Sequence, residues 1–246
     1  MFFTKSGMFA ATNAASTLNR NQFNSPKCEV HVYESTSKLM TKVLISGGGR
    51  CNVLHDTTKP LSKILSSYPR GQRELNGLYS KHFTPDDALE WFTSRGVVLK
   101  TESDGRMFPV TDKSQTIIDC IYEDAMNNGV VVKKGEKVVK VEKVNETNGD
   151  HNSFNIITQK SMEGENESGQ NFYDCIIMAT GSMPKGHEII KQLDVGHTIV
   201  DPIPSLFTLN AAKSQIKDHD GVLNNLAGLS VQNARLTLKV KGEIFY

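Results

Sequence analysis

Hydrophobic positions recur with a helical spacing near the amino terminus and then alternate in the manner of a strand. Residues 7–18 place methionine, phenylalanine, leucine and several alanines toward one side, which predicts a short helix that packs closely on a sheet. Residues 28–34 alternate, with Val30 and Val32 directed inward, and predict a strand. A helix followed by a strand is the second part of a βαβ unit.

The middle of the chain favours helices. Helical spacing of apolar residues predicts helices over 60–67, 85–95 and 113–128. Thr84 and Asp87 fit a capping box at the start of the helix over 85–95, with Asp in the place of the usual Glu. A short strand is expected at 97–100, directly after that helix.

From Val130 onward the pattern predicts strands. The expected strands are 130–132, 137–144, 154–159 and 172–179, and the polar stretches 145–153 and 160–171 are expected to be loops. The run CIIMATG, Cys175–Gly181, is almost continuously apolar, as in a strand buried on both faces of a parallel sheet. A helix is expected at 186–193. The composition changes at DPIP, residues 201–204, which predicts a boundary between domains at 1–203 and 204–246.

Composition narrows the class of protein and of partner. The chain of 246 residues carries 28 basic and 27 acidic side chains. Its net charge is therefore close to zero and does not indicate electrostatic attraction to nucleic acid or to a membrane surface. No apolar run approaches the ~20 residues that span a bilayer. The expected partner is therefore a small-molecule substrate, not nucleic acid or a membrane, and the oligomeric state is left open.

Cysteine usage indicates a reducing, intracellular compartment, cytoplasmic or organellar. The four cysteines lie far apart and form no C-x-x-C pair, which supports neither a zinc site nor a disulfide framework. The start of the chain, MFFTKSGMF, lacks the apolar core of a secretory signal and the character of a transit peptide. No His lies in a triad or HExxH pattern, so we expect no metal and assign no catalytic residue.

The segment KVLISGGGRCN, Lys42–Asn52, is the strongest indication of a binding site. It follows a strand with Glu34 at its tip, a position from which a carboxylate can bind both hydroxyls of an adenosine ribose. The three glycines, Gly47, Gly48 and Gly49, bring bare backbone N–H groups close to a bound group, and Arg50 adds a cation beside them. Strand, acidic tip and glycine-rich loop together predict a dinucleotide site.

Each of these residues also has a simpler interpretation. Glu34 is by itself an ordinary surface residue, and the glycines could form a plain turn, although Ser46 and Asn52 add convergent polar groups that a linker does not need. Cys51 has no partner cysteine nearby and is interpreted as a small packed residue. Arg106 faces a ligand or is structural, and the sequence does not decide between them.

Several separated motifs resemble one family. They occur in the order KVLISGGGRCNV, SYPRGQRELNG (67–77), DGRMFPVTDKS (104–114), CIIMATGS (175–182) and GHTIVDPIPSLFTL (196–209). Together they resemble the BaiN/aminoacetone-oxidase-like family of FAD-dependent flavoproteins, and most closely its plant and cyanobacterial branch. The resemblance covers roughly residues 6–246.

The resemblance implies an α/β, three-layer, Rossmann-like FAD/NAD(P)-binding fold. A helical insert near 60–128, a β-meander near 130–175 and the beginning of a β-rich inserted domain at 204–246 would accompany it. The implied function is FAD-dependent oxidoreduction, with NAD(P)H as a candidate electron donor. The residues that it implies for cofactor binding are Gly7, Glu34, Lys42, Ser46, Gly47, Gly48, Gly49, Arg50, Cys51, Asn52, Val138, Ala179, Thr180 and Gly181.

Two departures from the family lead to an alternative. Family members begin with a buried strand and a glycine-rich turn, where this chain has MFFTKS, and they continue beyond the position of Tyr246. We therefore expect a fragment with an incomplete cofactor site and, because a central strand would be missing, poor solubility. The alternative function is a catalytically inactive fragment or a dinucleotide-binding scaffold. A flavin-dependent RNA-modifying protein is a weaker third option, because RNA binding would require a basic face, which the nearly neutral net charge does not indicate.

Overall fold

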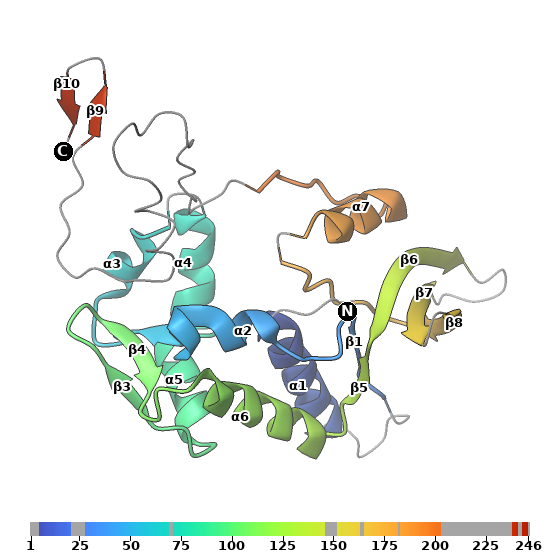
Figure 1. Ribbon diagram of the computed structural model, residues 1–246, viewed down its shortest axis with the longest axis horizontal. Coiled ribbons are helices and arrows are strands. Elements are labelled where there is room, and N and C mark those ends of the chain that lie inside the picture. The colour runs from blue at the N-terminus through green and yellow to red at the C-terminus, as the bar shows by residue number, and fades with distance from the viewer. Residues whose placement is uncertain are drawn as a thin grey trace, which may run out of the picture. The chain divides into compact units, whose positions relative to one another are not determined.

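The computed structural model describes residues 5–20, 28–68, 71–145, 152–162, 165–181, 183–202, 238–240 and 243–245. The chain divides into two units, Met1–Val200 and Asp201–Tyr246, and each is described by itself. In Figure 1 the first unit contains, in chain order, α1 (Lys5–Arg20), β1 (His31–Glu34), α2 (Thr41–Ile45), the tight turn η1 (Ser46–Gly49), β2 (Leu54–His55), α3 (Leu61–Leu65), α4 (Gln72–Lys81), α5 (Pro85–Thr93), β3 (Leu99–Thr101), β4 (Arg106–Pro109), α6 (Ser114–Asn127), β5 (Val131–Lys134), β6 (Glu136–Asn145), β7 (Asn152–Met162), β8 (Glu165–Tyr173) and α7 (Pro184–Leu193).

Strands β1 and β5 form a parallel pair. Val32 of β1 lies opposite Val132 of β5, and Glu34 lies opposite Lys134. The long connection between the two strands contains the glycine turn and the helical insert. The predicted α/β class, with helices, a parallel pair and antiparallel sheets, is confirmed.

Two antiparallel sheets complete the first unit. The strands of the insert form the order β2–β4–β3, and the strands after β5 form the meander β6–β7–β8. The stretch 160–171, which we expected to be a loop, instead contains the end of β7 and most of β8, so that prediction was wrong. Its polar side chains are compatible with a strand because an antiparallel sheet can keep one face in water.

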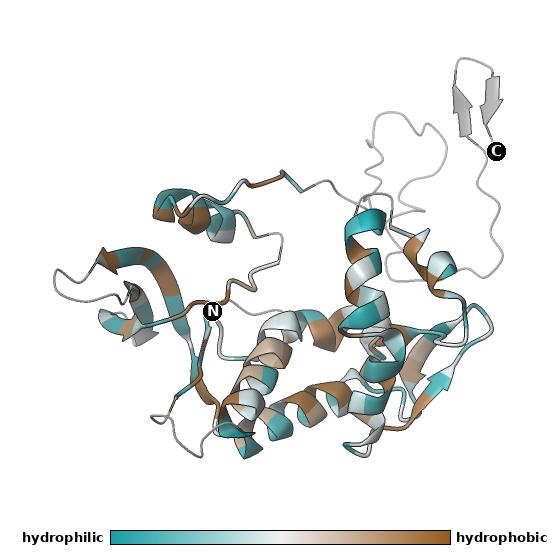
Figure 2. Cartoon of the chain, turned by 180° about the vertical axis from the view of Figure 1, so that it is seen from behind, coloured by the Kyte–Doolittle hydropathy of each residue, from teal (hydrophilic) through white to brown (hydrophobic). Residues whose placement is uncertain are grey.

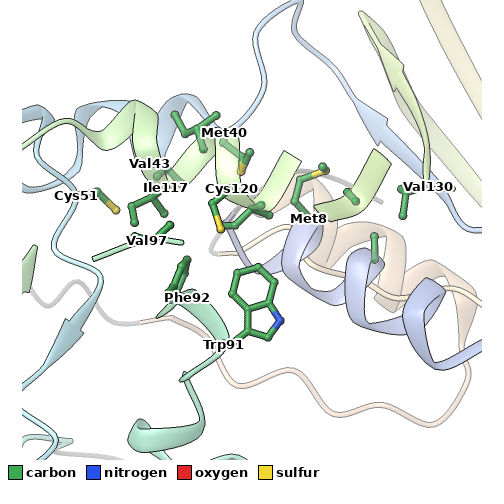
Figure 3. Close-up of a cluster of buried hydrophobic side chains, with 14 of the residues drawn as sticks. Met8, Met40, Val43, Cys51, Trp91, Phe92, Val97, Ile117, Cys120 and Val130 are labelled. Carbon is green, nitrogen blue, oxygen red and sulfur yellow. The ribbon is translucent and has the colours of Figure 1, made fainter. Parts of the chain in front are cut away.

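The main hydrophobic core lies between α1, α6 and α5 and includes the inner side of β1. Met8 and Ala11 of α1 and Val32 of β1 are completely buried in it, together with Ile117 and Ile121 of α6. Figure 3 shows labelled side chains from these elements directed toward one another, among them Met8, Trp91, Phe92, Ile117 and Cys120. The small alanines of α1 let the helix approach β1 closely.

A smaller core lies on the other side of β1. Tyr33 points into it and is 1% exposed, and Val138, Val141 and Ile156 of the meander surround it with Ile189 of α7. Successive side chains of a strand point to opposite faces. The pair Val32 and Tyr33 therefore anchors β1 in both cores.

The segment Cys175–Gly181 does not form the strand that its apolar sequence predicts. In the described residues it pairs with no other strand and is irregular between β8 and α7, and Ile177 is 48% exposed. Figure 2 colours this segment largely as hydrophobic. A strand needs a neighbour for its backbone hydrogen bonds, and among the described residues no strand forms a ladder with this segment, so the expected buried strand is not formed there.

Two further observations bear on the predictions. The capping box of α5 is confirmed, with the Thr84 side chain accepting from the backbone N–H of Asp87, and the Asp87 side chain accepting from the backbone N–H of Thr84. In the part of the chain that the structure describes, no helix combines the length and the apolar character needed to span a bilayer.

The second unit is described only as a hairpin. Its strands are β9 (Leu238–Val240) and β10 (Glu243–Phe245), which pair antiparallel. The remainder of 204–237, where the beginning of a β-rich domain was expected, lies outside the described residues.

Candidate functional site

Glu34 lies at the carboxyl end of β1 and is held in place by the turn that follows. It is 7% exposed, and its Oε1 atom accepts hydrogen bonds from the backbone N–H and the hydroxyl of Thr36, at 2.8 and 2.9 Å. Ser35 donates a third, longer bond of 3.3 Å to the same oxygen. In the described residues no partner is recorded for Oε2. The turn thus orients the carboxylate and leaves one oxygen for a ligand hydroxyl.

The glycine-rich turn has a left-handed backbone at all three glycines. Gly47, Gly48 and Gly49 have φ values of 57°, 69° and 85°, all in the left-handed region. The backbone N–H of Cys51 donates to the carbonyl of Ser46 at 3.0 Å and closes the loop. Successive backbone N–H groups in such turns form a concavity that favours an anion. Only glycine adopts three consecutive conformations of this kind without steric cost.

The loop is anchored on both sides. The hydroxyl of Ser114, at the start of α6, donates to the carbonyl of Leu44 at 2.8 Å, directly before the turn. After the turn, the backbone N–H of Val53 donates to the carbonyl of Met107 on β4 at 2.9 Å. The loop is therefore fixed to a helix and to a strand, and its N–H groups are oriented before any ligand arrives.

Arg50 does not stand free beside the glycines. Its guanidinium donates to Glu102 and, at 2.9 Å, to Asp112, and it lies over the ring of Phe108 with Cζ 4.0 Å from the ring centroid. The hydrogen bond with Glu102, followed by that with Asp112, raises the pKa of Arg50. The two carboxylates neutralise this cation, so the loop offers backbone N–H groups rather than a side-chain charge. Arg106 is likewise paired, with Asp104 at 2.6 Å.

A cavity of about 640 Å³ opens beside the glycine loop. We call it the aromatic cavity, because Phe9, Tyr68, Tyr79, Phe83 and Phe92 line it. It also has polar residues in its wall, namely Ser6, Asn52, His55 and Thr84. Its size lies within the range of ligand pockets for small molecules. The wall of this cavity thus includes both Ser6, in the first turn of α1, and Asn52, which ends the glycine-rich segment.

Two tyrosines form a neutral wall of the aromatic cavity. The hydroxyls of Tyr68 and Tyr79 are 3.0 Å apart, and their rings meet edge to face. The hydrogen bond with Tyr68, assisted by burial, raises the pKa of Tyr79 to about 12. Tyr79 therefore remains a neutral phenol at physiological pH and suits an uncharged, planar group.

The other residues predicted near the glycine loop differ in their exposure and their contacts. Gly7 is buried in the first turn of α1, Lys42 is exposed on α2, and Cys51 is 1% exposed in the main core, as a packed residue. Ser46 donates through its hydroxyl to Val43 at 2.9 Å. In the part of the chain described, no cluster of three or more His, Cys, Asp or Glu side chains could hold a metal ion.

Residues from the later strands lie apart from the glycine loop or close beside the main core. Val138 is 2% exposed and packs in the smaller core with Tyr33, not with the glycine loop. Ala179 packs against the main core, Thr180 is 5% exposed, and Gly181 has a φ of 61°. The sequence did not indicate Phe108 or the aromatic cavity, because their residues come together only through contacts between distant segments. The SYPRGQRELNG motif, which contains Tyr68, was the one signal that could have pointed to the cavity.

Comparison with known families agrees with this arrangement. The model of the HI0933-like protein Rossmann domain matches residues 5–222 of the chain, which include α1, Glu34 and the glycine loop. The placement in a plant and cyanobacterial branch and the truncation stay predictions. The match extends over most of the sequence, and the chain therefore belongs to the HI0933-like family of FAD-binding Rossmann domains.

Proposed function

We propose that this chain is the FAD-binding part of a flavin-dependent oxidoreductase. The single observation that carries the proposal is the carboxylate of Glu34, which is 7% exposed at the tip of β1 and has one oxygen held by Thr36. An acidic residue in this place, at the carboxyl end of a parallel strand, suits the hydroxyls of an adenosine ribose.

The glycine loop supplies the second contact for the cofactor. Its left-handed backbone from Gly47 to Gly49 suits the diphosphate, since the N–H groups of such a turn converge on an anion. Arg50 has the role of holding the loop to Glu102 and Asp112, not of binding phosphate. The residues present thus fit FAD through backbone groups and one carboxylate.

The aromatic cavity supplies the third contact. It begins at Asn52, where the glycine-rich segment ends, and its walls are aromatic and neutral. FAD provides the hydride chemistry when bound, and the protein provides position and electrostatics. With a planar ring bound, the cavity would exclude water from one of its faces, and the one hydroxyl proton that the hydrogen bond between Tyr68 and Tyr79 leaves over would be available to it. A small-molecule substrate would enter the same cavity.

The test is an absorbance scan of the full chain after incubation with FAD and desalting. We expect retained flavin absorbance near ~450 nm. Glu34→Gln should raise the dissociation constant for FAD about 10-fold or more, because a hydrogen bond to a charged group contributes about 1.5 to 3 kcal/mol. Retention of FAD by this variant at the affinity of the unmodified chain would refute the proposal.

A matched control separates the specific role of the Glu34 carboxylate from the general effect of losing one negative charge. Glu123 is exposed on α6, away from the proposed site, and Glu123→Gln makes the same change of charge. This variant should bind FAD as the unmodified chain does. Circular dichroism of both variants checks that neither has lost its fold.

A dinucleotide-binding scaffold without turnover is the second candidate. The neutralised state of Arg50 favours it, because no free side-chain cation remains on the glycine loop in the described residues. The two functions are separated by mixing the FAD-loaded chain with NADH or NADPH without oxygen. Loss of the ~450 nm band identifies an oxidoreductase with a nicotinamide donor. A band that persists with these donors, but disappears when dithionite reduces the bound flavin directly, identifies the scaffold.

A further inference from the structure

Two nitrogen-bearing side chains lie together at the edge of the aromatic cavity. His55, the last residue of β2, lines the cavity. Lys59 follows it by four residues, in the turn after β2, and is half-buried. Both side chains cover Gly105, which lies in the turn between β3 and β4. We call His55 and Lys59 the basic corner of the cavity.

Gly105 allows the two side chains to lie next to each other. A β-carbon added to Gly105 would be 2.5 Å from Cε1 of His55, 2.9 Å from its Nε2 and 2.5 Å from Nζ of Lys59. The imidazole and the ammonium group therefore lie side by side over the bare Cα of this glycine. The two turns are also joined through the backbone, because the N–H of Asp56 donates to the carbonyl of Gly105 at 2.7 Å.

The basic corner keeps its donors available for a ligand. The Lys59 ammonium and the His55 ring form no ion pair or hydrogen bond with any described residue. Arg50 and Arg106, the two arginines near the glycine loop, are by contrast both paired with carboxylates. Lys59 is thus a cation at the cavity edge whose hydrogen-bond donors are not taken up by the part of the chain that the structure describes.

Two carboxylates beside the basic corner have donors of their own. Oδ1 of Asp56 accepts from the hydroxyl and the backbone N–H of Thr58, at 2.7 and 3.1 Å. These bonds, and then the charge of Lys59 acting from beyond ion-pair distance, lower the pKa of Asp56. Asp104 accepts from Arg106 at 2.6 Å. The corner is therefore left for a negatively charged group that comes from outside the chain.

The rest of the cavity wall suits an apolar body. Phe9 and Phe83 meet edge to face in this wall, with ring centroids 5.9 Å apart, and Ile64 and Ala88 add aliphatic surface. Small-molecule sites combine such apolar walls with a few polar groups that fix the orientation of the ligand. One ammonium group beside a neutral wall matches a ligand with a single negative charge and a flat, apolar remainder.

From these observations we infer that the aromatic cavity binds a substrate with a planar, apolar body and one carboxylate, and that the carboxylate lies at the basic corner. Nζ of Lys59 donates a charge-assisted hydrogen bond to the carboxylate, and a ring N–H of His55 donates a second. The body packs against Phe9 and Phe83. The inference rests on the proposed function in one respect, since it takes this ligand to be the substrate of the flavin-dependent reaction.

The test compares two ligands of the same shape on the full chain. 1-Naphthoate carries a carboxylate on a bicyclic ring, and 1-naphthamide carries an uncharged amide in its place. Equilibrium dialysis measures both dissociation constants, with the chain before and after incubation with FAD. We expect 1-naphthoate to bind about fivefold more tightly, the upper range for a partly exposed ion pair, and to lose this preference in about 1 M salt.

Two charge variants locate the preference. Lys59→Gln removes the cation but keeps most of the apolar stem, so the two ligands should bind with equal affinity. Lys63→Gln makes the same change of charge at an exposed position of α3, next to Ile64 of the cavity wall. This control variant should keep the fivefold preference of the unmodified chain.

Two glycine variants test the geometry. Gly105→Ala places a methyl group where Lys59 and His55 now lie, so it should also abolish the preference for 1-naphthoate. Gly96→Ala is its control, because Gly96 has a similar φ of 82° and nothing lies within 4 Å of an added β-carbon. It should show the backbone strain without a loss of preference. Circular dichroism checks that each variant is folded.

Several outcomes would overturn the inference. These are failure of both ligands to bind, equal binding of the two by the unmodified chain, and a preference that survives Lys59→Gln. Loss of the preference in Lys63→Gln would also overturn it, because a general positive field would then attract the anion. Retention of FAD with equal binding of both ligands would refute only the basic corner. Selective binding of 1-naphthoate by a chain that retains no FAD would support the basic corner and refute the proposed flavin site.

Discussion

Gly47 and Phe108 lie so close that a β-carbon added to Gly47 would be 3.1 Å from Cε1 of the ring. The same β-carbon would be 2.9 Å from the backbone nitrogen of Asn52. The guanidinium of Arg50 lies over the ring of the same Phe108. Phe108 of β4 therefore packs directly against the glycine loop, a contact that no local feature of the loop sequence indicates.

Gly47→Ala should destabilise the chain more than Gly48→Ala. Both glycines have positive φ, and an L-residue there costs about 1 to 2 kcal/mol. Gly48 has nothing within 4 Å of an added β-carbon, so its variant shows the backbone strain alone. Gly47→Ala adds a collision with Asn52 and Phe108, for a total loss of about 2 to 4 kcal/mol. Urea unfolding of the two variants measures the difference, and equal losses would contradict the close contact.

The ion pairs of Asp112 should weaken in acid. Its carboxylate accepts from Lys100 and from Arg50, in that order of importance, and these bonds hold its pKa below the ordinary 3.8. A carboxyl with a lowered folded pKa contributes stability above the unfolded value, and the contribution is lost as the pH falls through the folded pKa. The melting temperature of the unmodified chain should exceed that of Asp112→Asn above pH 3.8, and the gap should close below it.

The measurement is thermal unfolding of both proteins from about pH 6 to about pH 3. Asp201→Asn is a matched control, because Asp201 is exposed and takes part in no recorded ion pair of the described residues. Its melting temperature should follow that of the unmodified chain at every pH. A gap for Asp112→Asn that stays constant into acid would show that the ion pairs do not hold the loop.

Elements with strong local patterns could be predicted from the sequence. The helix predicted over 7–18 corresponds to α1, and that over 113–128 corresponds to α6, because each has an apolar stripe that faces the main core. Helix α4 was missed. It has no buried residue and contains Gly77, which lowers the helix propensity, although Leu75, Leu78 and Tyr79 have helical spacing.

Contacts between distant segments could not be predicted. Arg50 was expected beside the cofactor, yet its partners Glu102 and Asp112 are 52 and 62 residues away in the sequence. The segment Cys175–Gly181 carries a clear strand pattern, but a strand also depends on its neighbour, which a pattern within one segment does not contain. Glu34 and the three glycines, by contrast, were indicated by local sequence because their conformations depend on adjacent residues.

Tyr173→Phe should cost more stability than Tyr33→Phe. The hydroxyl of Tyr173 is 2.6 Å from that of Tyr33 and 2.7 Å from Nδ1 of His31, so its removal breaks two hydrogen bonds. Removal of the Tyr33 hydroxyl also breaks two hydrogen bonds, but the second, from Lys133, is long at 3.2 Å, and Tyr173 stays bonded to His31. We expect losses of about 2 kcal/mol and about 1 kcal/mol, respectively, from urea unfolding. A larger loss for Tyr33→Phe would mean that Lys133, 3.2 Å from the Tyr33 hydroxyl, matters more than His31.

Two glycines inside helices should respond to alanine with opposite signs. In α7, a β-carbon on Gly186 would be 2.1 Å from Oγ1 and 2.6 Å from Cβ of Thr180. In α4, a β-carbon on Gly77 would have nothing within 4 Å. Gly77→Ala should therefore stabilise the chain by about 0.5 to 1 kcal/mol, since alanine favours a helix over glycine.

Gly186→Ala should instead destabilise the chain by about 1 to 3 kcal/mol, because α7 must move away from Thr180. The displacement would also move Thr180, which the family resemblance implies for cofactor binding, so FAD retention should fall together with stability. Thr180→Gly in the Gly186→Ala background removes all three colliding atoms, Oγ1, Cβ and Cγ2, and should recover part of the loss of stability without restoring FAD binding. Chemical unfolding and flavin absorbance after desalting measure the two effects separately. A Gly186→Ala variant as stable as Gly77→Ala would contradict the close packing of α7 on Thr180.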